Sequence, residues 1–302
     1  MKIGLMLGAT DEGNLDSIIE SAKRAEASGF DNLWMANIFG YDAISTLALI
    51  GRETSTIGLG TAVTPTYPRH PTAIAQQAVT TGVAAGGRFT LGIGLSHKVV
   101  IEDMLGFSYD KPARHMREYL EVLGPLLRGE TVNFDGEQYR VHNLTISVPD
   151  RKPVPLLIAA LGPAMLKLAG EKADGTVTWM TGPNTLETHI APSITGAATA
   201  AGRDAPRIAA GFPVVLTSDA DGAREFIAKT LQIYGMLPSY RAMLDKEGVT
   251  GPAELAIVGD EAALRSAIDR LRNIGVTDFC ASVTARDADE LRRTTEFLAT
   301  LV

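Results

Sequence analysis

The stretch from Thr56 to His97, TIGLGTAVTPTYPRHPTAIAQQAVTTGVAAGGRFTLGIGLSH, decides how this chain folds. Its first part, residues 57–63, contains only glycine, threonine and aliphatic residues, which is typical of a buried strand. A helical pattern follows over residues 72–85, with Thr72 as the expected N-cap and Gly86-Gly87 as the expected end. Residues 88–95 are apolar on both faces, as in a parallel strand that is covered on both sides. Strand, helix and strand in this order predict a parallel βαβ unit.

The same alternation of strand and helix runs along the whole chain. Eight strands, each followed by a helical pattern, predict a closed (β/α)8 TIM barrel of the α/β class, as a single domain over residues 1–302. The polar segment 132–146 contains an Asp-Gly turn and predicts a hairpin inserted between strands four and five. An open doubly wound sheet is the alternative, but residues 7–11, Leu-Gly-Ala-Thr-Asp, lack the GxGxxG turn that it requires. The expected strands are residues 2–7, 32–36, 57–63, 88–95, 154–160, 176–180, 208–216 and 278–283.

Composition narrows the class of protein. The 302 residues are 45% apolar and 21% charged, which is ordinary for a soluble globular protein. The net charge of −7 argues against nucleic acid or an anionic membrane as the main partner. The single cysteine, Cys280, excludes an intrachain disulfide and argues against a thiolate metal site. We expect a cytoplasmic protein, because the apolar run at the N-terminus is too short for a signal peptide and no run approaches the ~20 residues of a membrane helix.

The residues at the C-terminal ends of the expected strands are the candidates for chemistry, because active sites of such barrels lie there. Most are small, amide or hydroxyl residues, so a glycosidase with paired carboxylates or a hard-cation site lacks its ligands. The chain has no GxSxG, HExxH or P-loop motif. Such a rim fits a large bound cofactor that brings its own reactivity. The candidates are Gly8, Ala9, Asn37, Thr61 to Thr64, Ser96, His97, Ala159 to Gly162, Trp179 to Thr181, Thr217 and Val283 to Arg286.

Five stretches carry a more specific pattern. They are AEASGFDNLWMAN (25–37), GTAVTPTYPRHP (60–71), GGRFTLGIG (86–94), PLLIAALGPAMLKLAGEKADGTV (155–177) and IGVTDF (274–279). In them the chain resembles the bacterial-luciferase-like superfamily of barrel oxidoreductases, and most of all the branch that uses the deazaflavin coenzyme F420. The second and fourth stretches are similar to methylenetetrahydromethanopterin reductases of that branch. FMN is the alternative cofactor, because both cofactors share the barrel and its phosphate site.

The resemblance implies a cofactor site. Family members have a non-proline cis peptide at the end of strand three, on which the ring rests, and the matching bond here is Ala62-Val63. An ordinary trans bond in a tight turn is the other interpretation. The turn Ala159 to Gly162 leads into a helix whose amides would attract a phosphate, although an ordinary strand-to-helix turn has the same sequence character. The residues expected at the cofactor are Asn37, Thr61, Ala62, Val63, Ser96, Ala159, Ala160, Leu161, Gly162, Trp179, Met180 and Thr181.

His97 is the expected catalytic residue. It follows strand four, where the resemblance implies a carboxylate in deazaflavin-dependent alcohol dehydrogenases. An imidazole with an unperturbed pKa near ~6.5 could accept a hydroxyl proton as hydride leaves the substrate carbon. The alternative is a rim histidine that only makes hydrogen bonds. Asn37 could hydrogen-bond the ring or a carbonyl but cannot exchange protons. His70 is expected to satisfy backbone groups at a helix entry.

Three functions from different classes remain open at this point. The preferred one is an F420-dependent oxidoreductase, a dehydrogenase or reductase that moves a hydride between C5 of the deazaflavin and a small organic substrate. An FMN-dependent luciferase-like monooxygenase is the first alternative, and a non-catalytic flavin- or deazaflavin-binding protein is the second. The resemblance implies a homodimer through the helices that flank strands two and three. Segments 97–110 and 235–259 are expected to shape the substrate pocket.

Overall fold

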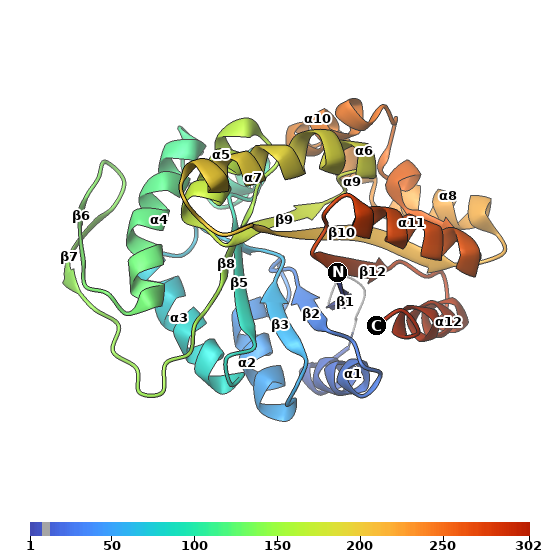
Figure 1. Ribbon diagram of the computed structural model, residues 1–302, viewed down its shortest axis with the longest axis horizontal. Coiled ribbons are helices and arrows are strands. Elements are labelled where there is room, and N and C mark those ends of the chain that lie inside the picture. Colours follow the sequence, from blue (N-terminus) through green and yellow to red (C-terminus); the bar gives the residue numbers. More distant parts are fainter. Residues whose placement is uncertain (8–12) are drawn as a thin grey trace.

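The computed structural model describes residues 1–7 and 13–302, and its centre is a closed barrel of parallel strands (Figure 1). Within these residues eight strands pair side by side, and the pairings of β9 with β10 and of β12 with β1 close the ring. Around the barrel they are β1 (Lys2–Leu7), β2 (Asn32–Met35), β3 (Gly58–Thr61), β5 (Phe89–Gly94), β8 (Leu156–Ala159), β9 (Gly175–Trp179), β10 (Arg207–Leu216) and β12 (Asp278–Val283). The predicted (β/α)8 TIM barrel is confirmed.

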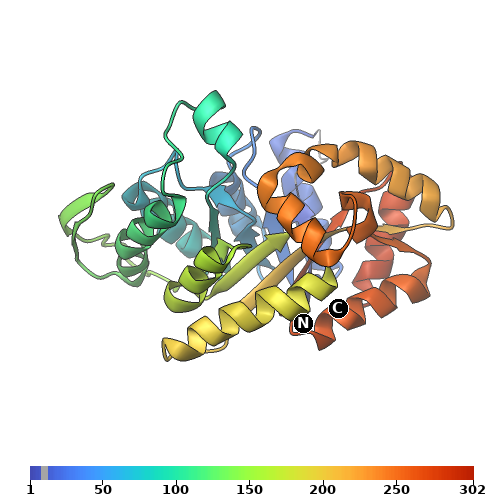
Figure 2. The ribbon, with the colours of Figure 1, turned by 90° about the horizontal axis from the view of Figure 1, so that it is seen from above.

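Helices surround this barrel, as Figure 2 shows from above. Several begin at an aspartate or asparagine whose side chain accepts a hydrogen bond from the first-turn backbone, for example Asn14, Asp42 and Asp260. No helix in the described ranges is long and apolar enough to cross a membrane. The longer helices are α1 (Leu15–Ala27), α2 (Ala43–Glu53), α3 (Pro71–Ala84), α4 (Pro112–Arg128), α5 (Pro163–Lys172), α7 (Ala191–Ala200), α8 (Ala220–Thr230), α11 (Glu261–Asn273) and α12 (Ala288–Ala299).

The predicted hairpin is also present. Strands β6 (Val132–Asp135) and β7 (Arg140–Leu144) pair antiparallel between β5 and β8 in the sequence. They form a separate sheet at the edge of the molecule, beside α4 (Figure 1). The hairpin therefore extends the outside of the barrel and leaves its order of strands unchanged.

One local expectation was wrong, and one segment without a predicted structure is now described. The N-cap of α3 is His70, not Thr72, because Pro71 occupies the first helical position and the His70 imidazole accepts from the Thr72 amide at 3.3 Å. Segment 235–259, for which the sequence showed no regular pattern, is mostly ordered in short elements. These are the end of α9 (Gln232–Met236), α10 (Pro238–Glu247), a 3-10 turn (Pro252–Leu255) and β11 (Ile257–Gly259), which pairs with β10.

Glycines on the strands make room for a large side chain inside the barrel. Trp34 on β2 is 1% exposed and packs in the interior against Leu157 and Cys280. A Cβ atom at Gly60 on the neighbouring β3 would lie 2.5 Å from the Trp34 ring. Any other residue at position 60 would therefore collide with the indole. Glycine at position 60 on β3 is required because the Trp34 side chain on β2 fills the barrel interior beside it.

The N-terminal end of the barrel is closed by a buried ion pair. Asp278 is 2% exposed and binds the Arg207 guanidinium at 2.7 Å. The Asn32 amide donates to the same carboxylate at 3.2 Å, and Arg207 also donates to the Thr90 hydroxyl at 3.1 Å. The guanidinium lies 5.9 Å from the Trp34 ring centroid, within cation–π distance. Asp278 and Arg207 thus fill the end of the barrel that lies opposite the expected active site.

We predict that Asp278→Ala destabilises the fold strongly, because it leaves the Arg207 charge half-buried without its partner. The expected loss in free energy of unfolding is about 3–5 kcal/mol, measured by urea unfolding followed by circular dichroism. Asp289→Ala, which removes the exposed ion pairs with Arg292 and Arg293 on α12, is the matched control and should lower stability far less. Equal losses in the two variants would contradict the structural role of the buried pair.

Candidate functional site

A cavity of about 700 Å³ opens at the C-terminal ends of the barrel strands. Its walls come from the turn after β3, the segment after β5, the turn between β8 and α5, and the junction of α9 and α10. Small-molecule sites commonly measure about 300–1,000 Å³, so this cavity can hold a cofactor-sized ligand. The lining residues are Val63, Gly94, Leu95, Ser96, His97, Lys98, Val99, Glu102, Asp103, Tyr109, Ala159, Leu161, Gly162, Met165, Met236, Leu237, Pro238, Ser239 and Tyr240.

The turn after β3 presents Val63 to the cavity. The peptide bond between Ala62 and Val63 is cis, as the resemblance implied. A Cβ atom at Gly94 on β5 would lie 2.6 Å from Val63 Cγ2, so glycine at 94 is what allows the valine to sit there. Thr61 does not line the cavity: it is fully buried, and its hydroxyl donates to the Gly92 carbonyl oxygen at 2.7 Å. Thr61 therefore braces β3 against β5 behind the wall that Val63 forms.

The turn between β8 and α5 leaves the start of a helix open to the cavity. Gly162 is the N-cap of α5, and no side chain caps the first-turn amides. A Cβ atom placed on Gly162 would meet no heavy atom within 4 Å. Ala159 and Leu161 line the cavity beside it, whereas Ala160 is fully buried. Free amides at a helix N-terminus with open space in front of them are suited to bind an anion.

The end of β9 lies behind the cavity rather than in its lining. Met180 has a left-handed backbone (φ 52°) and is fully buried against Leu244 and Leu255. Thr181 is also fully buried, and the Trp179 indole packs edge-on against Tyr234 at a centroid distance of 6.1 Å. The structure thus joins the end of β9 to α9 and α10. Contact of residues 179–181 with a phosphate stays a prediction.

His97 lies in the cavity at the start of a π-helical turn, Val99–Met104. Its backbone carbonyl accepts from the amides of Val100 and Ile101, both at 2.9 Å, so the turn fixes its position. Ser96 before it has a left-handed backbone (φ 59°) and also lines the cavity. Burial lowers the pKa of the His97 imidazole, which is therefore neutral at pH 7 and can accept a proton.

Asn37 stands apart from this group. Its side-chain oxygen accepts from the Ala43 amide at 3.0 Å at the start of α2 and from the Arg69 guanidinium at 3.4 Å. The amide oxygen is thus committed to the protein, and Asn37 is not among the residues that line the cavity. A ring contact through its amide nitrogen stays a prediction. His70 caps α3, which confirms its expected structural role.

The sequence analysis expected segment 235–259 at the substrate pocket but did not identify the residues of α9 and α10 that line this cavity. Met236, Leu237, Pro238 and Tyr240 form one wall of the cavity, and the Tyr240 ring lies 5.5 Å from the His97 ring. The segment showed no helical period long enough to place it. The tyrosines at 234 and 240 around Pro238 were the available signal, because aromatic residues beside a proline turn suit the wall of a pocket.

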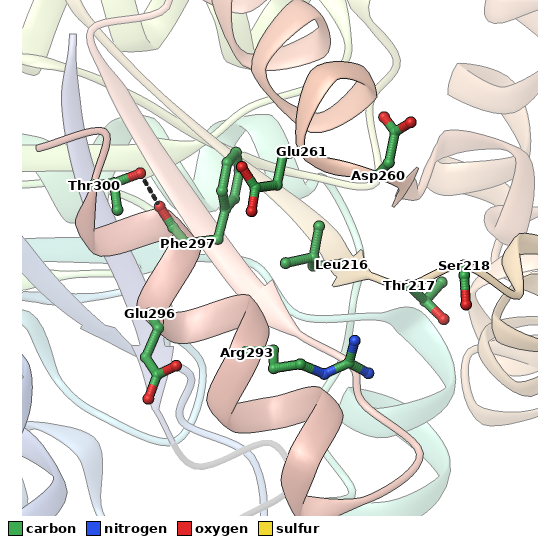
Figure 3. Close-up of a pocket in the computed structure, with 9 residues that line it drawn as sticks. All are labelled: Leu216, Thr217, Ser218, Asp260, Glu261, Arg293, Glu296, Phe297 and Thr300. Atoms are coloured by element: carbon green, nitrogen blue, oxygen red, sulfur yellow. Dashed lines mark hydrogen bonds between the residues drawn. The ribbon is translucent and has the colours of Figure 1, made fainter.

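A second cavity, of about 520 Å³, lies outside the barrel wall (Figure 3). It opens between the end of β10, the start of α11 and the side of α12. Its polar lining includes Asp260, Glu261, Arg293 and Glu296, with Phe297 at one side. One of the candidate strand-end residues, Thr217, lines this cavity, but none of the residues expected at the cofactor does.

A buried histidine stands beside the main cavity. Tyr109 in the cavity wall stacks on Tyr67 at 5.3 Å, and Tyr67 stacks on His115 at 3.9 Å. The His115 ring nitrogens lie 2.9 Å from the Thr66 hydroxyl and 3.1 Å from the side-chain amide oxygen of Gln138. Burial lowers the pKa of His115 from 6.5 to about 4, so the imidazole is neutral at pH 7. This cluster supports the aromatic side of the cavity.

Comparison with known proteins finds a matching family and several similar proteins. A sequence model of the luciferase-like monooxygenase family matches residues 1–278. The chain is 30% identical to a 5,10-methylenetetrahydromethanopterin reductase from Methanolobus tindarius, over 82% of this chain and 75% of the relative. It is 29% identical to an F420-dependent glucose-6-phosphate dehydrogenase from Kineococcus radiotolerans, over 84% of this chain and 78% of the relative.

A solved structure agrees with these relatives. The coenzyme F420 dependent tetrahydromethanopterin reductase from Methanopyrus kandleri superposes with a TM-score of 0.82 at 25% identity. The match covers 100% of this chain and 98% of that one. The likeness therefore extends over the barrel and over the segments that build the cavity.

We predict that His115 makes stability depend on pH in the acid range. Between pH 6.5 and about 4 the unfolded chain binds a proton at His115 and the folded chain does not, so stability falls as pH falls through this window. The expected contribution is about 1–3 kcal/mol. His115→Gln should flatten the dependence of the free energy of unfolding on pH in this range, whereas His142→Gln, at an exposed hairpin position, should not. If the free energy of unfolding of His115→Gln keeps the same dependence on pH, His115 is not a neutral histidine in the folded protein.

Proposed function

The chain belongs to the luciferase-like monooxygenase family, and on this premise we propose that it is an oxidoreductase that transfers a hydride between coenzyme F420 and a small organic substrate. The observation that carries the proposal is one cavity that holds Val63, the open start of α5 and a neutral His97. A ring support, an anion site and a proton acceptor are what such a reaction asks of the protein. The F420-dependent relatives support the choice of coenzyme.

The cavity fits a cofactor that has a flat ring and a phosphate. Its volume of about 700 Å³ is sufficient, and the glycine at 94 leaves Val63 free to face a ring. The uncapped first turn of α5 at Gly162 supplies amides for the phosphate, and the small side chain of Ala159 lets it approach. These residues would hold the cofactor, and the amides of residues 179–181, at and after the end of β9, would lie behind it.

When bound, the deazaflavin supplies a carbon, C5, that accepts or gives back a hydride. The protein supplies the proton chemistry. As the carbinol hydrogen of an alcohol leaves with its electron pair, the hydroxyl oxygen forms a carbonyl and its proton passes to the neutral His97 imidazole. In the reverse direction His97 returns that proton to the oxygen. The lowered pKa of His97 keeps the accepting form populated at pH 7.

An FMN-dependent monooxygenase is the second candidate, because the matching family model is that of luciferase-like monooxygenases and the sequence resemblance leaves FMN as the alternative cofactor. It would use the same cavity with a different ring.

A second copy of the chain is the proposed partner in either case. Phe39 is 66% exposed, and Ile38 and Leu49 are 56% and 45% exposed, on the loop before α2 and on α2 itself. These apolar side chains support a homodimer through this side of the barrel, measurable by light scattering.

The direct test of the proposed function is a fluorescence titration of the purified protein with coenzyme F420 and, in parallel, with FMN. We expect coenzyme F420 to bind in the micromolar range or tighter and FMN to bind more weakly. Gly162→Asp should weaken coenzyme binding by at least about tenfold, because its carboxylate caps α5 and repels the phosphate.

The matched control is Gly162→Ala, since a Cβ atom at 162 has open space around it. It should bind coenzyme F420 nearly as well as the unchanged protein, and both variants should retain the melting temperature. Tighter binding of FMN would favour the monooxygenase, and a failure of either ring to bind would refute the proposal.

We predict that His97→Asn lowers kcat/KM for hydride transfer by about 10²–10⁴-fold and leaves coenzyme affinity unchanged, because it removes only the proton acceptor. In the unchanged protein the rate of alcohol oxidation should fall on the acid side with an apparent pKa below 6.5, since burial lowers the pKa of His97. Steady-state rates from pH 4.5 to 9 give both quantities. A variant that retains the rate and the acid limb would show that another group accepts the proton.

A further inference from the structure

The short helix α10 is fixed to the end of β9. Glu247 at the end of α10 accepts from the amides of Asn184 and Thr185, at 3.0 and 2.7 Å, and from the Thr185 hydroxyl at 2.7 Å. These two residues belong to α6 (Pro183–Thr185), which follows β9, and Figure 1 shows α6, α9 and α10 together at that end. Met180 and Leu244 add a buried apolar contact between the same two segments. The wall that α10 forms is therefore a fixed part of the cavity.

This attachment places Tyr240 against the catalytic candidate. The Tyr240 ring lies 5.5 Å from the His97 ring and packs edge-on against Tyr234 at 5.1 Å. Burial and the neighbouring Tyr234 raise the pKa of Tyr240, so its hydroxyl stays protonated at neutral pH and can donate a hydrogen bond. In the part of the chain that the structure describes, neither the Tyr240 hydroxyl nor the His97 imidazole has a hydrogen-bond partner.

A phenol that donates and a neutral imidazole that accepts can share one small polar group. An alcohol oxygen satisfies both at once, since it accepts from the phenol and donates to the imidazole. The carbonyl oxygen formed by its oxidation accepts from both once His97 carries the proton. Both side chains line one cavity, so a single ligand oxygen can meet both.

The charges around this pair indicate what kind of molecule carries that oxygen. Lys98 is the one lysine or arginine that lines the described cavity; it is largely exposed and pairs with Glu102 at 3.5 Å. Asp103 adds a further negative charge to the described lining. A phosphorylated substrate would find no guanidinium or free ammonium there. The remaining lining near the pair is mostly apolar, with Leu95, Met236 and Leu237.

We propose that Tyr240 is a second catalytic residue, which donates a hydrogen bond to the substrate oxygen that His97 deprotonates, and that the substrate is an uncharged alcohol or carbonyl compound with an apolar body. This inference rests on the proposed function. In oxidation the carbinol carbon loses a hydride to coenzyme F420, the hydroxyl proton moves to His97, and the phenol of Tyr240 keeps its proton throughout. In reduction the hydride and the proton return to the same carbon and oxygen.

The test uses Tyr240→Phe, which keeps the aromatic packing on His97 and Tyr234 and removes only the hydroxyl. With coenzyme F420 and cyclohexanol, 2-octanol or 2-propanol as substrate, kcat/KM should fall about 10–1,000-fold, as for loss of one donor to a reacting oxygen. Coenzyme affinity should change less than about twofold. Tyr234→Phe, at a tyrosine of the same cluster that does not line the cavity, is the matched control and should keep the rate.

A binding measurement gives a readout apart from turnover. 1-Methylcyclohexanol has no carbinol hydrogen and cannot react, so its competition against cyclohexanol reports binding at the oxygen site. Its inhibition constant should rise about three- to tenfold in Tyr240→Phe and stay constant in Tyr234→Phe. An unchanged inhibition constant and an unchanged rate in Tyr240→Phe would overturn the role of Tyr240.

A substrate comparison tests the chemical class. We expect at least one of the three alcohols to reduce coenzyme F420 and glucose 6-phosphate not to do so. Turnover of glucose 6-phosphate, or binding of the coenzyme with no turnover of any of the alcohols, would overturn the inference and leave the proposed cofactor intact. Failure to bind coenzyme F420 at all would instead refute the proposed function, and the inference with it.

Discussion

Close packing between β3, β5 and the interior of the barrel is the constraint on which the site depends. Trp34 fills the barrel interior and leaves room only for glycine at position 60. One layer higher, the turn after β3 pushes Val63 inward, and only glycine at position 94 leaves space for its side chain. The floor of the cavity is therefore set by steric exclusion among residues of two neighbouring strands, with the Thr61 hydroxyl bonded to β5 behind it.

The rest of the site is arranged on this floor. The uncapped start of α5 lies at one side of the cavity, and His97 lies at another, held by the π-helical turn after β5. The segment formed by α9 and α10 supplies the remaining wall and is fixed by Glu247 to the end of β9. The cavity thus combines three features. The turn after β3 supports the ring, the start of α5 offers an anion site, and the segment after β5 together with α10 provides a pair of polar groups.

Much of this architecture follows from the sequence, and the reasons differ from part to part. The eight strands and the inserted hairpin were predictable because periodic apolar patterns report directly on burial. The cis bond at Ala62-Val63 was not predictable from physical chemistry and came from the resemblance alone. His97 was predictable as a rim residue because it directly follows a strand, but its neutral state depends on burial that only tertiary structure reveals.

The sequence did not predict segments that are short, or side chains whose positions depend on contacts with distant parts of the chain. α9 spans only five residues, and Pro238 begins α10 directly after it, so no continuous helical period crosses this segment. Their position depends on the contacts of Glu247 and Leu244 with the end of β9, more than 60 residues earlier. Met180 and Thr181 look like rim residues in the sequence, yet both are fully buried, Met180 against Leu244 and Leu255. Asn37 likewise turns its oxygen to α2 rather than to the cavity.

A crystal structure of the protein grown with coenzyme F420 tests the central claim most directly. The account predicts the phosphate at the first-turn amides of α5 beside Gly162, the deazaflavin ring against Val63, and His97 with Tyr240 facing the reactive side of the ring. Density for the coenzyme outside this cavity, for example between α11 and α12, or a ring turned away from Val63, would contradict it.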